Sequence, residues 1–437
     1  MKSRRVGLWR IAALVFFLLV SNSAWAQNKS AYISNRLSDN VSVIDTVSNA
    51  ITATIDVGIA PFGVAVSPNG SRVYVVNSDL DVTGGSVSVI DTASNSVIAT
   101  IPVGSQPNGV AVSPDNATAY VTNTLDNTVS VIDTATNEVT ATIGVGSEPS
   151  GVAVSPNGKA VYVTNFVDSS VSVIGPASET VTTTIPLGSG SGPVGVAVTP
   201  DSSAIYVADS ISGDVSVICA SSNTVIATIP LSGLEPVPDG VAISPDGKTA
   251  YVTDGSDNLV HVIDITTNQV TTAMPTSNGA FGVAVTADGK SVYVAAPPID
   301  EVDAIDMATN SITAAIPVGR EPVAFGLFIQ PAVPTSPNFS IAPNASSETV
   351  KGGRSRKFSL RLESVNGFDG RVKLNCVGGP PGTRCSNFPR TIRVHGRTTA
   401  SSGIRFPKDT APGTYPITFS GQSSALTSTA WELFTVK

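Results

Sequence analysis

The chain has 437 residues, enough for two or three domains, and a formal net charge of −8. The charge is unevenly divided: residues 27–333 carry 7 basic and 28 acidic side chains, whereas residues 334–437 carry 14 basic and 5 acidic ones. An acidic body with no interleaving of aromatic and basic residues argues against nucleic acid as a partner. The sequence holds 2 histidines and 3 cysteines and no CxxCH motif, which excludes a multi-histidine copper centre and a covalently attached haem of the c type.

Residues 1–26 have the layout of a secretory signal peptide. Basic residues from Lys2 to Arg10 precede or border an apolar run at 11–20, and Ala24-Trp25-Ala26 offers small residues for cleavage after Ala26. The apolar run is too short to span a bilayer as a helix, so we expect no transmembrane segment in the mature chain. The protein is predicted to be exported, to the periplasm or the cell surface. Ser3-Arg4-Arg5 leaves a twin-arginine route open beside the general one.

An internal repeat fills residues 27–333. The sequence GVAVSP or a close variant occurs six times, and its glycines recur every 42 to 46 residues at Gly63, Gly109, Gly151, Gly195, Gly240 and Gly282, with Gly326 continuing the series. Four short runs rich in Val, Ile, Thr and Tyr follow within each unit, separated by turn residues. This pattern predicts a four-stranded antiparallel meander per unit.

Tyrosine fixes the number of units. Seven of the eight tyrosines occupy one repeat position: Tyr32, Tyr74, Tyr120, Tyr162, Tyr206, Tyr251 and Tyr293. The first of them has no GVAVSP strand ahead of it, and GLFIQP at 326–331 has no tyrosine strand after it. We therefore expect an all-β, seven-bladed β-propeller whose first blade takes three strands from the N-terminus and one from residues 326–331, a 3+1 strand clasp that closes the ring.

The turns between the strands have recognisable chemistry. Pro68-Asn69-Gly70 and its equivalents supply the fixed φ, the side-chain acceptor and the left-handed glycine of a tight hairpin. Aspartates at one recurring position are predicted to cap the second kind of turn rather than to bind a ligand: Asp45, Asp91, Asp133, Asp264 and Asp306. Cys219 takes the same position and is expected to be an inert strand-end residue. Runs such as VIATIPV do not alternate, which favours blades that are buried on both faces.

YVTN at 120–123 and 162–165, together with VSVIDTATN at 129–137, resembles the YVTN-type β-propeller repeat of secreted and surface-layer proteins, including YncE-like proteins. The resemblance extends over about 300 residues and recurs in every unit. It implies the propeller fold. It leaves the activity open, because related propellers include lactonases, electron-transfer enzymes and plain binding scaffolds.

The tail domain, residues 334–437, begins within a Pro/Ser linker, AVPTSPN at 332–338. About seven short alternating runs follow the linker and predict an immunoglobulin-like β-sandwich. VNGFDGRVKLNCVGGPPGTRC at 365–385 resembles bacterial immunoglobulin-like modules of exported proteins. Cys376 and Cys385 lie close together in this stretch. In an oxidising compartment such a pair is expected to form a disulfide rather than half of a metal site.

Catalytic chemistry has few candidates, and no catalytic residue, cofactor or metal site is assigned. The two histidines lie in different domains: His261 stands in VHVID where sister repeats have VSVID, and His395 lies in a tail-domain strand. The GVAV runs that would line a lactonase channel hold no Arg, His, Glu or Lys. Residues 77–85 alternate oxygen donors a little like a calcium loop, but they lack its bidentate glutamate, and a solvated polar turn is favoured.

Binding is the better supported expectation. The loops joining the second and third strands, and those between blades, share one face and carry the variation in sequence, whereas the other face carries uniform turns. The residue before each repeat glycine is predicted to ring the channel mouth and to bind a partner or a small organic ligand: Phe62, Asn108, Ser150, Val194, Asp239, Phe281 and Phe325. The alternative is that the three phenylalanines, which are neighbours around the closure, simply plug the channel.

A basic cluster marks the tail domain and could meet anionic envelope polymers or the acidic propeller: Lys351, Arg354, Arg356, Lys357, Arg361, Arg371 and Lys373. The function predicted from the sequence is therefore that of an exported, non-catalytic binding or scaffold protein of the cell envelope. The alternatives are a lactonase-like hydrolase and a structural surface-layer subunit.

Overall fold

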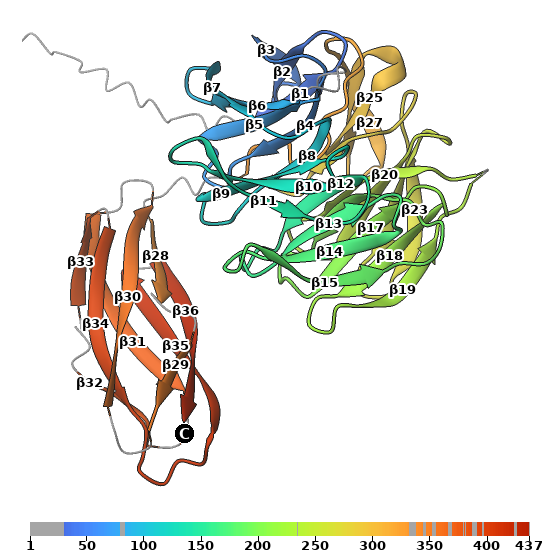
Figure 1. The fold of residues 1–437 in the computed structure, drawn as a ribbon. Coiled ribbons are helices and arrows are strands. Elements are labelled where there is room, and N and C mark those ends of the chain that lie inside the picture. Colours follow the sequence, from blue (N-terminus) through green and yellow to red (C-terminus); the bar gives the residue numbers. More distant parts are fainter. Residues whose placement is uncertain are drawn as a thin grey trace, which may run out of the picture. The chain divides into compact units, whose positions relative to one another are not determined.

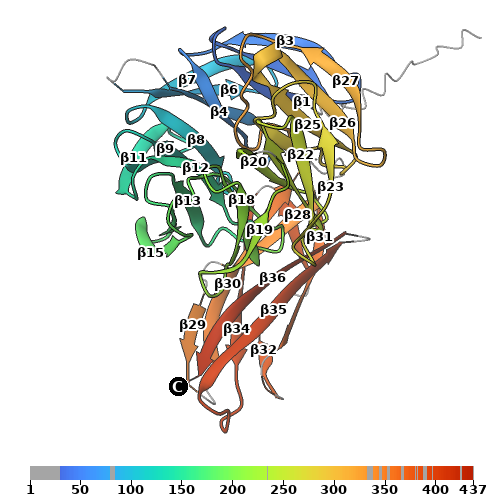
Figure 2. The ribbon, with the colours of Figure 1, turned by 90° about the vertical axis from the view of Figure 1, so that its right-hand side faces the viewer.

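The computed structural model describes residues 30–331 apart from 79–83 and 234, and residues 338–436 apart from 344–346, 352–354, 366–368, 379, 381, 387–390, 396 and 424–425. The chain divides into two compact units, Met1–Ala332 and Val333–Lys437. Across the described residues, no helix has the length and apolar character needed to cross a membrane. Figure 1 and Figure 2 show that both units are built from strands.

The first unit consists of repeated antiparallel sheets, as a β-propeller requires. Its described residues form one three-stranded sheet and six four-stranded sheets, here called sheets 1 to 7 in chain order. Sheets 1 to 4 comprise β1 Ser30–Asn35, β2 Asn40–Asp45, β3 Ala50–Asp56; β4 Pro61–Val66, β5 Arg72–Asn77, β6 Ser86–Asp91, β7 Ser96–Pro102; β8 Pro107–Val112, β9 Thr118–Asn123, β10 Thr128–Asp133, β11 Glu138–Gly144; β12 Pro149–Val154, β13 Val161–Asn165, β14 Ser170–Gly175 and β15 Thr180–Pro186. Sheets 5 to 7 comprise β16 Pro193–Val198, β17 Ala204–Asp209, β18 Asp214–Cys219, β19 Thr224–Pro230; β20 Pro238–Ile243, β21 Thr249–Asp254, β22 Leu259–Asp264, β23 Gln269–Pro275; β24 Val283–Val285, β25 Ser291–Ala296, β26 Glu301–Asp306 and β27 Ser311–Pro317, with a 3₁₀ turn, η1, at Pro297–Ile299.

The turns form as their residue types predict. Asp91 Oδ1 accepts the backbone N–H groups of Ala93 and Ser94 at 3.1 and 2.9 Å, and the other recurring aspartates repeat these bonds. Hydrogen bonds from the backbone, and at Asp306 first the bond from the Thr309 hydroxyl, lower the pKa of each carboxyl group. The capping role of the aspartates is therefore confirmed. The two kinds of turn lie on one face, because Thr92 Oγ1 at the second turn donates to the Gly70 carbonyl of the first at 2.8 Å.

Residues 322–330 lie beside β1, where the missing fourth strand was expected. Pro322 pairs with Asn35 and Ile329 pairs with Ala31, both antiparallel. The Tyr32 N–H donates to the Phe328 carbonyl at 2.9 Å, and the Gln330 N–H donates to the Ser30 carbonyl at 2.8 Å. We call residues 322–330 the clasp, because they join the last part of the propeller chain to its first strand.

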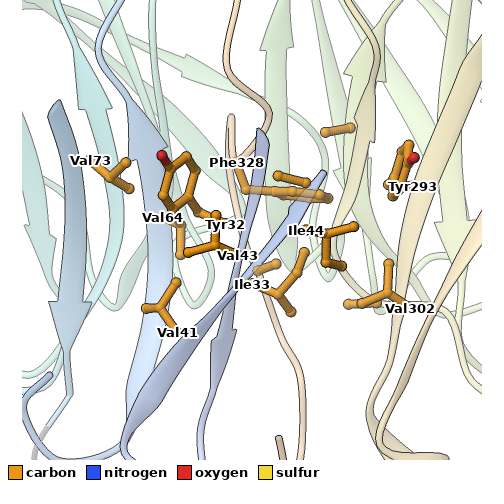
Figure 3. Packing of buried hydrophobic residues seen from close by; sticks show 14 of the residues in the cluster. Tyr32, Ile33, Val41, Val43, Ile44, Val64, Val73, Tyr293, Val302 and Phe328 are labelled. Atoms are coloured by element: carbon orange, nitrogen blue, oxygen red, sulfur yellow. The ribbon is translucent and has the colours of Figure 1, made fainter. Parts of the chain in front are cut away.

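The core lies between neighbouring sheets. Tyr32, Phe328 and Tyr293 belong to one buried cluster that draws on sheets 1, 2 and 7 and on the clasp, and Figure 3 shows Phe328 among Tyr32, Ile33 and Ile44. The second and third strands of each sheet are buried on both faces. The fourth strands differ from the prediction. In β7 exposed residues alternate with half-buried ones up to the buried Ile101, so one face of this outermost strand is open to solvent.

The second unit contains two sheets that share one apolar core, with side chains such as Leu360, Ala400, Val372, Ile417 and Phe434 buried between them. One sheet has the order β28-β30-β34-β32 and the other β29-β36-β35-β31-β33. The strands are β28 Asn338–Pro343, β29 Ser347–Val350, β30 Ser355–Val365, β31 Asp369–Gly378, β32 Arg384–Ser386, β33 Thr391–His395, β34 Arg397–Arg405, β35 Gly413–Ser423 and β36 Leu426–Val436.

Candidate functional site

The loops opposite the turns form a second face of the propeller, here called the loop face. It comprises the loops between the second and third strands of each sheet and the connections from one sheet to the next. Direct hydrogen bonds tie these segments together. Asp126 Oδ2 accepts the Ser105 N–H at 2.7 Å, and Asp168 Oδ2 accepts the Ser147 N–H at 2.8 Å. The variable loops are therefore held on a rigid base, as a recognition surface requires.

A buried asparagine anchors each loop of sheets 2 to 4. The amide of Asn123, at the end of β9, donates to Thr128 Oγ1 and Ser130 Oγ at 3.0 and 2.9 Å, and its Oδ1 accepts the Gly104 N–H at 3.1 Å. Asn77 and Asn165 make the equivalent bonds. One side chain thus joins the second strand, the third strand and the incoming connection.

Apolar side chains stand exposed at the tips of these loops. Leu125, Val167 and Ile211 occupy the same loop position in sheets 3, 4 and 5, two residues after the strand ends, and are 48, 57 and 62 % exposed. We call these three residues the apolar arc. A cavity of about 470 Å³ lies between its last two members, lined by Phe166, Val167, Asp168, Ser169, Pro186, Gly188, Ser189, Gly190 and Ile211.

The loop face was predicted from the sequence, but the apolar arc was not. A signal was available, because an apolar residue follows two positions after the asparagine or aspartate that ends the second strand, as in Asn123-Thr124-Leu125 and Asp209-Ser210-Ile211. Leu37, after Asn35, continues the pattern in sheet 1 and is also exposed.

Three phenylalanines meet at the channel, as the alternative interpretation of the ring anticipated. The Phe62 and Phe281 ring centroids are 5.6 Å apart in an edge-to-face arrangement, and each lies 6.0 Å from Phe325. Such aromatic pairs contribute about 0.5–1.5 kcal/mol each beyond the area they bury. The rings pack on one another, so this side of the channel mouth is closed by apolar contacts.

The predicted ring positions are held by a hydroxyl relay between sheets. Thr164 Oγ1 accepts the Gly151 N–H at 2.8 Å and donates to the Val194 carbonyl of the next sheet, also at 2.8 Å. Thr122 and Thr253 link Ser150 and Phe281 in the same way. A Cβ on Gly151 would lie 2.3 Å from the Val194 carbonyl oxygen, so a side chain cannot be accommodated at this position.

Phe325 does not occupy the position that the glycine alignment gave it. In sheet 1 the relay hydroxyl belongs to Ser34, which accepts the Ala324 N–H at 3.0 Å and donates to the Phe62 carbonyl at 2.6 Å. Ala324 therefore replaces the repeat glycine, and Val323 replaces the ring residue. On the N-terminal side of Phe328 the clasp has two residues more than a regular inner strand. The extra residues form a bulge at Phe325 and Gly326, and the φ angle of Gly326 is +116°.

This bulge fills the channel. Phe325 and Gly326, together with the repeat glycines and the valines that follow them, enclose a central cavity of about 30 Å³. That volume is enough for about one water molecule.

The remaining ring residues form a more polar half of the mouth. Asn108 Oδ1 is buried and has no hydrogen-bond partner among the described residues, and Ser150 is buried. Burial, followed by the charge of Asp254, raises the pKa of Asp239 to about 7. Asp239 can therefore gain or lose a proton near neutral pH.

His261 has a partner that the sequence did not suggest. Its Nε2 lies 3.4 Å from Asp254 Oδ2, and both side chains are fully buried. Burial alone would raise the pKa of Asp254, but hydrogen bonds from His261, Ser256 and the backbone outweigh it and lower the pKa to about 2.

Cys219 lies at the end of β18, and its thiol is 3.3 Å from Ser221 Oγ. Hydrogen bonds from Ser221 and Ser222 lower the pKa of this thiol to about 6. A lowered pKa favours the thiolate form, whereas the repeat position predicted an inert strand-end residue.

Among the described residues, no group of three or more His, Cys, Asp and Glu side chains is placed to hold a metal ion. The calcium-like segment lies partly outside the described residues, at 79–83, as do the side chains of His395, Cys385, Arg354 and Arg356. Four members of the basic cluster, Lys351, Lys357, Arg371 and Lys373, are exposed, and Arg361 is half-buried.

Comparison with known proteins supports the fold. The family model described as SMP-30/Gluconolactonase/LRE-like region matches residues 64–194. A chain of Kuenenia stuttgartiensis hydrazine synthase is similar at 27% identity and a TM-score of 0.59, over 64% of this chain and 93% of that one. A Desulfotomaculum acetoxidans protein of unknown function and a candidate 6-phosphogluconolactonase of Bacteroides uniformis are each 17% identical, with TM-scores of 0.58 and 0.59. Both cover 68% of this chain, and the matches span 100% and 98% of theirs. No curated protein matches. The first unit is thus a β-propeller similar to these proteins.

Proposed function

We propose that this protein is an exported, non-catalytic binding protein of the cell envelope, and that the loop face of a seven-bladed propeller recognises its partner. The apolar arc is the observation that carries this proposal. Three apolar side chains stand exposed at equivalent loop tips, and two of them, Val167 and Ile211, line a cavity of about 470 Å³. Contact with another molecule would remove these side chains from water. The partner class is an envelope protein or polymer with apolar groups.

The channel supports the same conclusion. Phe62, Phe281 and Phe325 pack together at its mouth, and the clasp leaves about 30 Å³ inside it. A ring closed in this way acts as a rigid base for the loops. The surface-layer alternative uses the same face, and self-assembly of the purified protein into sheets would identify it.

A lactonase-like hydrolase is the second candidate, because the family match covers residues 64–194 and Asp239 has a pKa near neutrality, as a general base requires. Hydrolysis of an aldonolactone by the purified protein, lost in Asp239→Asn with the fold intact, would favour this candidate over binding. An equal background rate in both forms would remove it.

The export and tail assignments belong to the same proposal. Residues 1–26 would direct export, and a disulfide between Cys376 and Cys385 would stabilise an immunoglobulin-like tail domain. Tyr415, at the start of β35, supports this domain type, since its hydroxyl donates to the Ala411 carbonyl at 2.8 Å in the manner of a tyrosine corner. The exposed basic residues of the tail would attach the protein to anionic envelope polymers.

The decisive test compares two triple variants of the mature protein on isolated envelope fractions. Leu125→Ser, Val167→Ser and Ile211→Ser together remove the arc. Ile98→Ser, Val139→Ser and Ile226→Ser change three exposed apolar residues on outer strands and serve as the matched control. We expect retention to fall at least tenfold in the arc variant and to stay unchanged in the control.

Equal retention of both variants would contradict recognition by the loop face. A salt series on the unmodified protein separates the role of the tail. Attachment through exposed basic side chains should weaken between about 0.05 and 0.5 M salt, because screening shortens the range of charge interactions.

A further inference from the structure

The face that carries the turns contains a second, different cavity at the opposite end of the channel. It has a volume of about 300 Å³ and lies among the last residues of the inner strands β8, β12, β16 and β20. We call it the funnel. Its lining includes Val112, Val154, Val198 and Ile243 from the strands, the turn prolines Pro156, Pro200 and Pro245, and Leu327 of the clasp.

The clasp explains why the funnel lies on one side of the channel. Phe325 and Leu327 accept backbone hydrogen bonds from Val64 and Val66 of β4, each at 2.9 Å, so the bulge leans on sheet 2. Val64 and Val66 are buried as a result. On sheets 5 and 6 the corresponding Val196 and Val241 stay half-buried, and their aliphatic side chains face open space beside Leu327.

The lining of the funnel contains no charged side chain. The funnel and the small central cavity are neighbours along the channel, because Gly326 of the bulge and the valines at 110, 152, 196 and 241 line both. The one hydroxyl in the lining, that of Ser244, already donates to Asp246 Oδ1 at 2.7 Å. Because no charged side chain lies in the lining and this hydroxyl is engaged, a ligand with a charge or several polar groups would lose hydration without compensation.

The size of the funnel indicates a small molecule rather than a protein chain. A cavity of about 150 Å³ lined by aliphatic and aromatic groups suffices to bind benzene, and small-molecule sites begin at about 300 Å³. A protein partner needs about 800 Å² of contact on each side. A cavity of this size cannot supply such an area.

We propose that the funnel binds a small uncharged apolar molecule, of the size of a bicyclic hydrocarbon or a short alkyl chain. Leu327, 67 % exposed at the rim, forms the wall that closes over it. This site lies on the face opposite the apolar arc and does not depend on the partner proposed there.

Titration of the full-length protein with N-phenyl-1-naphthylamine, an uncharged fluorophore, tests this proposal. We expect a saturable rise in fluorescence with one molecule bound per chain. Leu327→Asp should weaken binding at least tenfold, because it places a charge at the rim. Val47→Asp is the matched control, since Val47 is an exposed apolar residue on the same face outside the funnel, and it should bind like the unmodified protein.

A second variant protects the test against a folding defect. Ala197→Leu adds volume inside the funnel from a half-buried position and should also weaken binding, with an unchanged melting temperature. A fluorescence rise that does not saturate, or equal affinities for the Leu327→Asp and Val47→Asp proteins, would overturn the proposal. Unchanged binding in Ala197→Leu would overturn it as well.

Discussion

Sheets 2 to 4 and sheets 5 and 6 use different side chains at the end of the second strand, where hydrogen bonds to the third strand and to the loop are made. In sheets 2 to 4 the second strand ends in asparagine, and in sheets 5 and 6 it ends in Asp209 and Asp254. Asparagine both donates and accepts hydrogen bonds, so one neutral side chain can bond to the third strand and to the loop at the same time. An ionised carboxylate can only accept, and it brings a charge into a buried position.

The two aspartates differ in how that charge is handled. Asp254 is paired with His261, which stands where the sister strands of sheets 1 to 5 have serine. Asp209 accepts a bond from Ser216 Oγ at 2.6 Å, but its Oδ1 is buried without a partner among the described residues. Burial therefore raises the pKa of Asp209 to about 7, opposed by the bond from Ser216 and reinforced by the nearby Asp214. A buried carboxylate in this repeat therefore needs several hydrogen-bond donors, as Asp254 has, or a proton.

The largest effect is expected from breaking the buried pair. His261→Ala should lower the free energy of unfolding by about 3–5 kcal/mol at pH 7, because it removes the buried partner of Asp254 Oδ2 and leaves the carboxylate with only the bonds to Oδ1. Denaturant unfolding measures this loss. The sister change Ser172→Ala removes a neutral hydroxyl and should cost about 1 kcal/mol. Equal losses in the two variants would mean that the pair contributes no more than an ordinary hydrogen bond.

The reverse substitution introduces a buried carboxylate into sheet 4, where the third strand has no histidine. Asn165→Asp removes the amide that donates to Ser170 and Ser172 and should destabilise the protein by about 1–3 kcal/mol at pH 8. The loss should shrink at pH 5, where a buried carboxyl can keep its proton. Melting curves at the two pH values test this, and a loss that does not depend on pH would contradict the role given to the charge.

The smallest change restores the common residue in sheet 5. The pKa of Asp209 lies at about 7 in the folded protein, above its ordinary value of 3.8, so folding takes up a proton between these values. Stability from this group is therefore present at low pH and is lost as the pH rises from about 4 to 7. Asp209→Asn should remove this dependence and raise the free energy of unfolding by about 1–2 kcal/mol at pH 8. A variant less stable than the original at pH 8 would disprove this account.

The regular parts of the fold could be predicted from the sequence because local chemistry repeats there. The tyrosines, the turn aspartates and the proline-asparagine-glycine turns each recur with one structural role. The clasp was placed beside the correct strand, but its register was shifted by two residues, because the alignment followed Gly326 instead of Pro322. Pro322 pairs with Asn35 as Pro107 and Pro149 pair with the asparagines of their own sheets.

The funnel and the buried pair could not be predicted in this way. GVAV reads identically in sheets 2 to 5, and whether its valines are covered depends on a bulge that comes more than two hundred residues after the first of them. Asp254 and His261 lie on different strands. In sheets 1 to 5 both positions hold polar residues, so neither stands out as a partner of the other.

The clasp also determines how the propeller responds to force. The second unit follows the clasp directly in the chain, so a pull on that unit reaches the propeller at Pro331 before any other residue. The load then falls on the few backbone bonds that hold residues 322–330 to β1 and β4. If the tail is the anchor, the strand that closes the ring is also the first strand under tension, and its release would open the propeller between sheets 1 and 7.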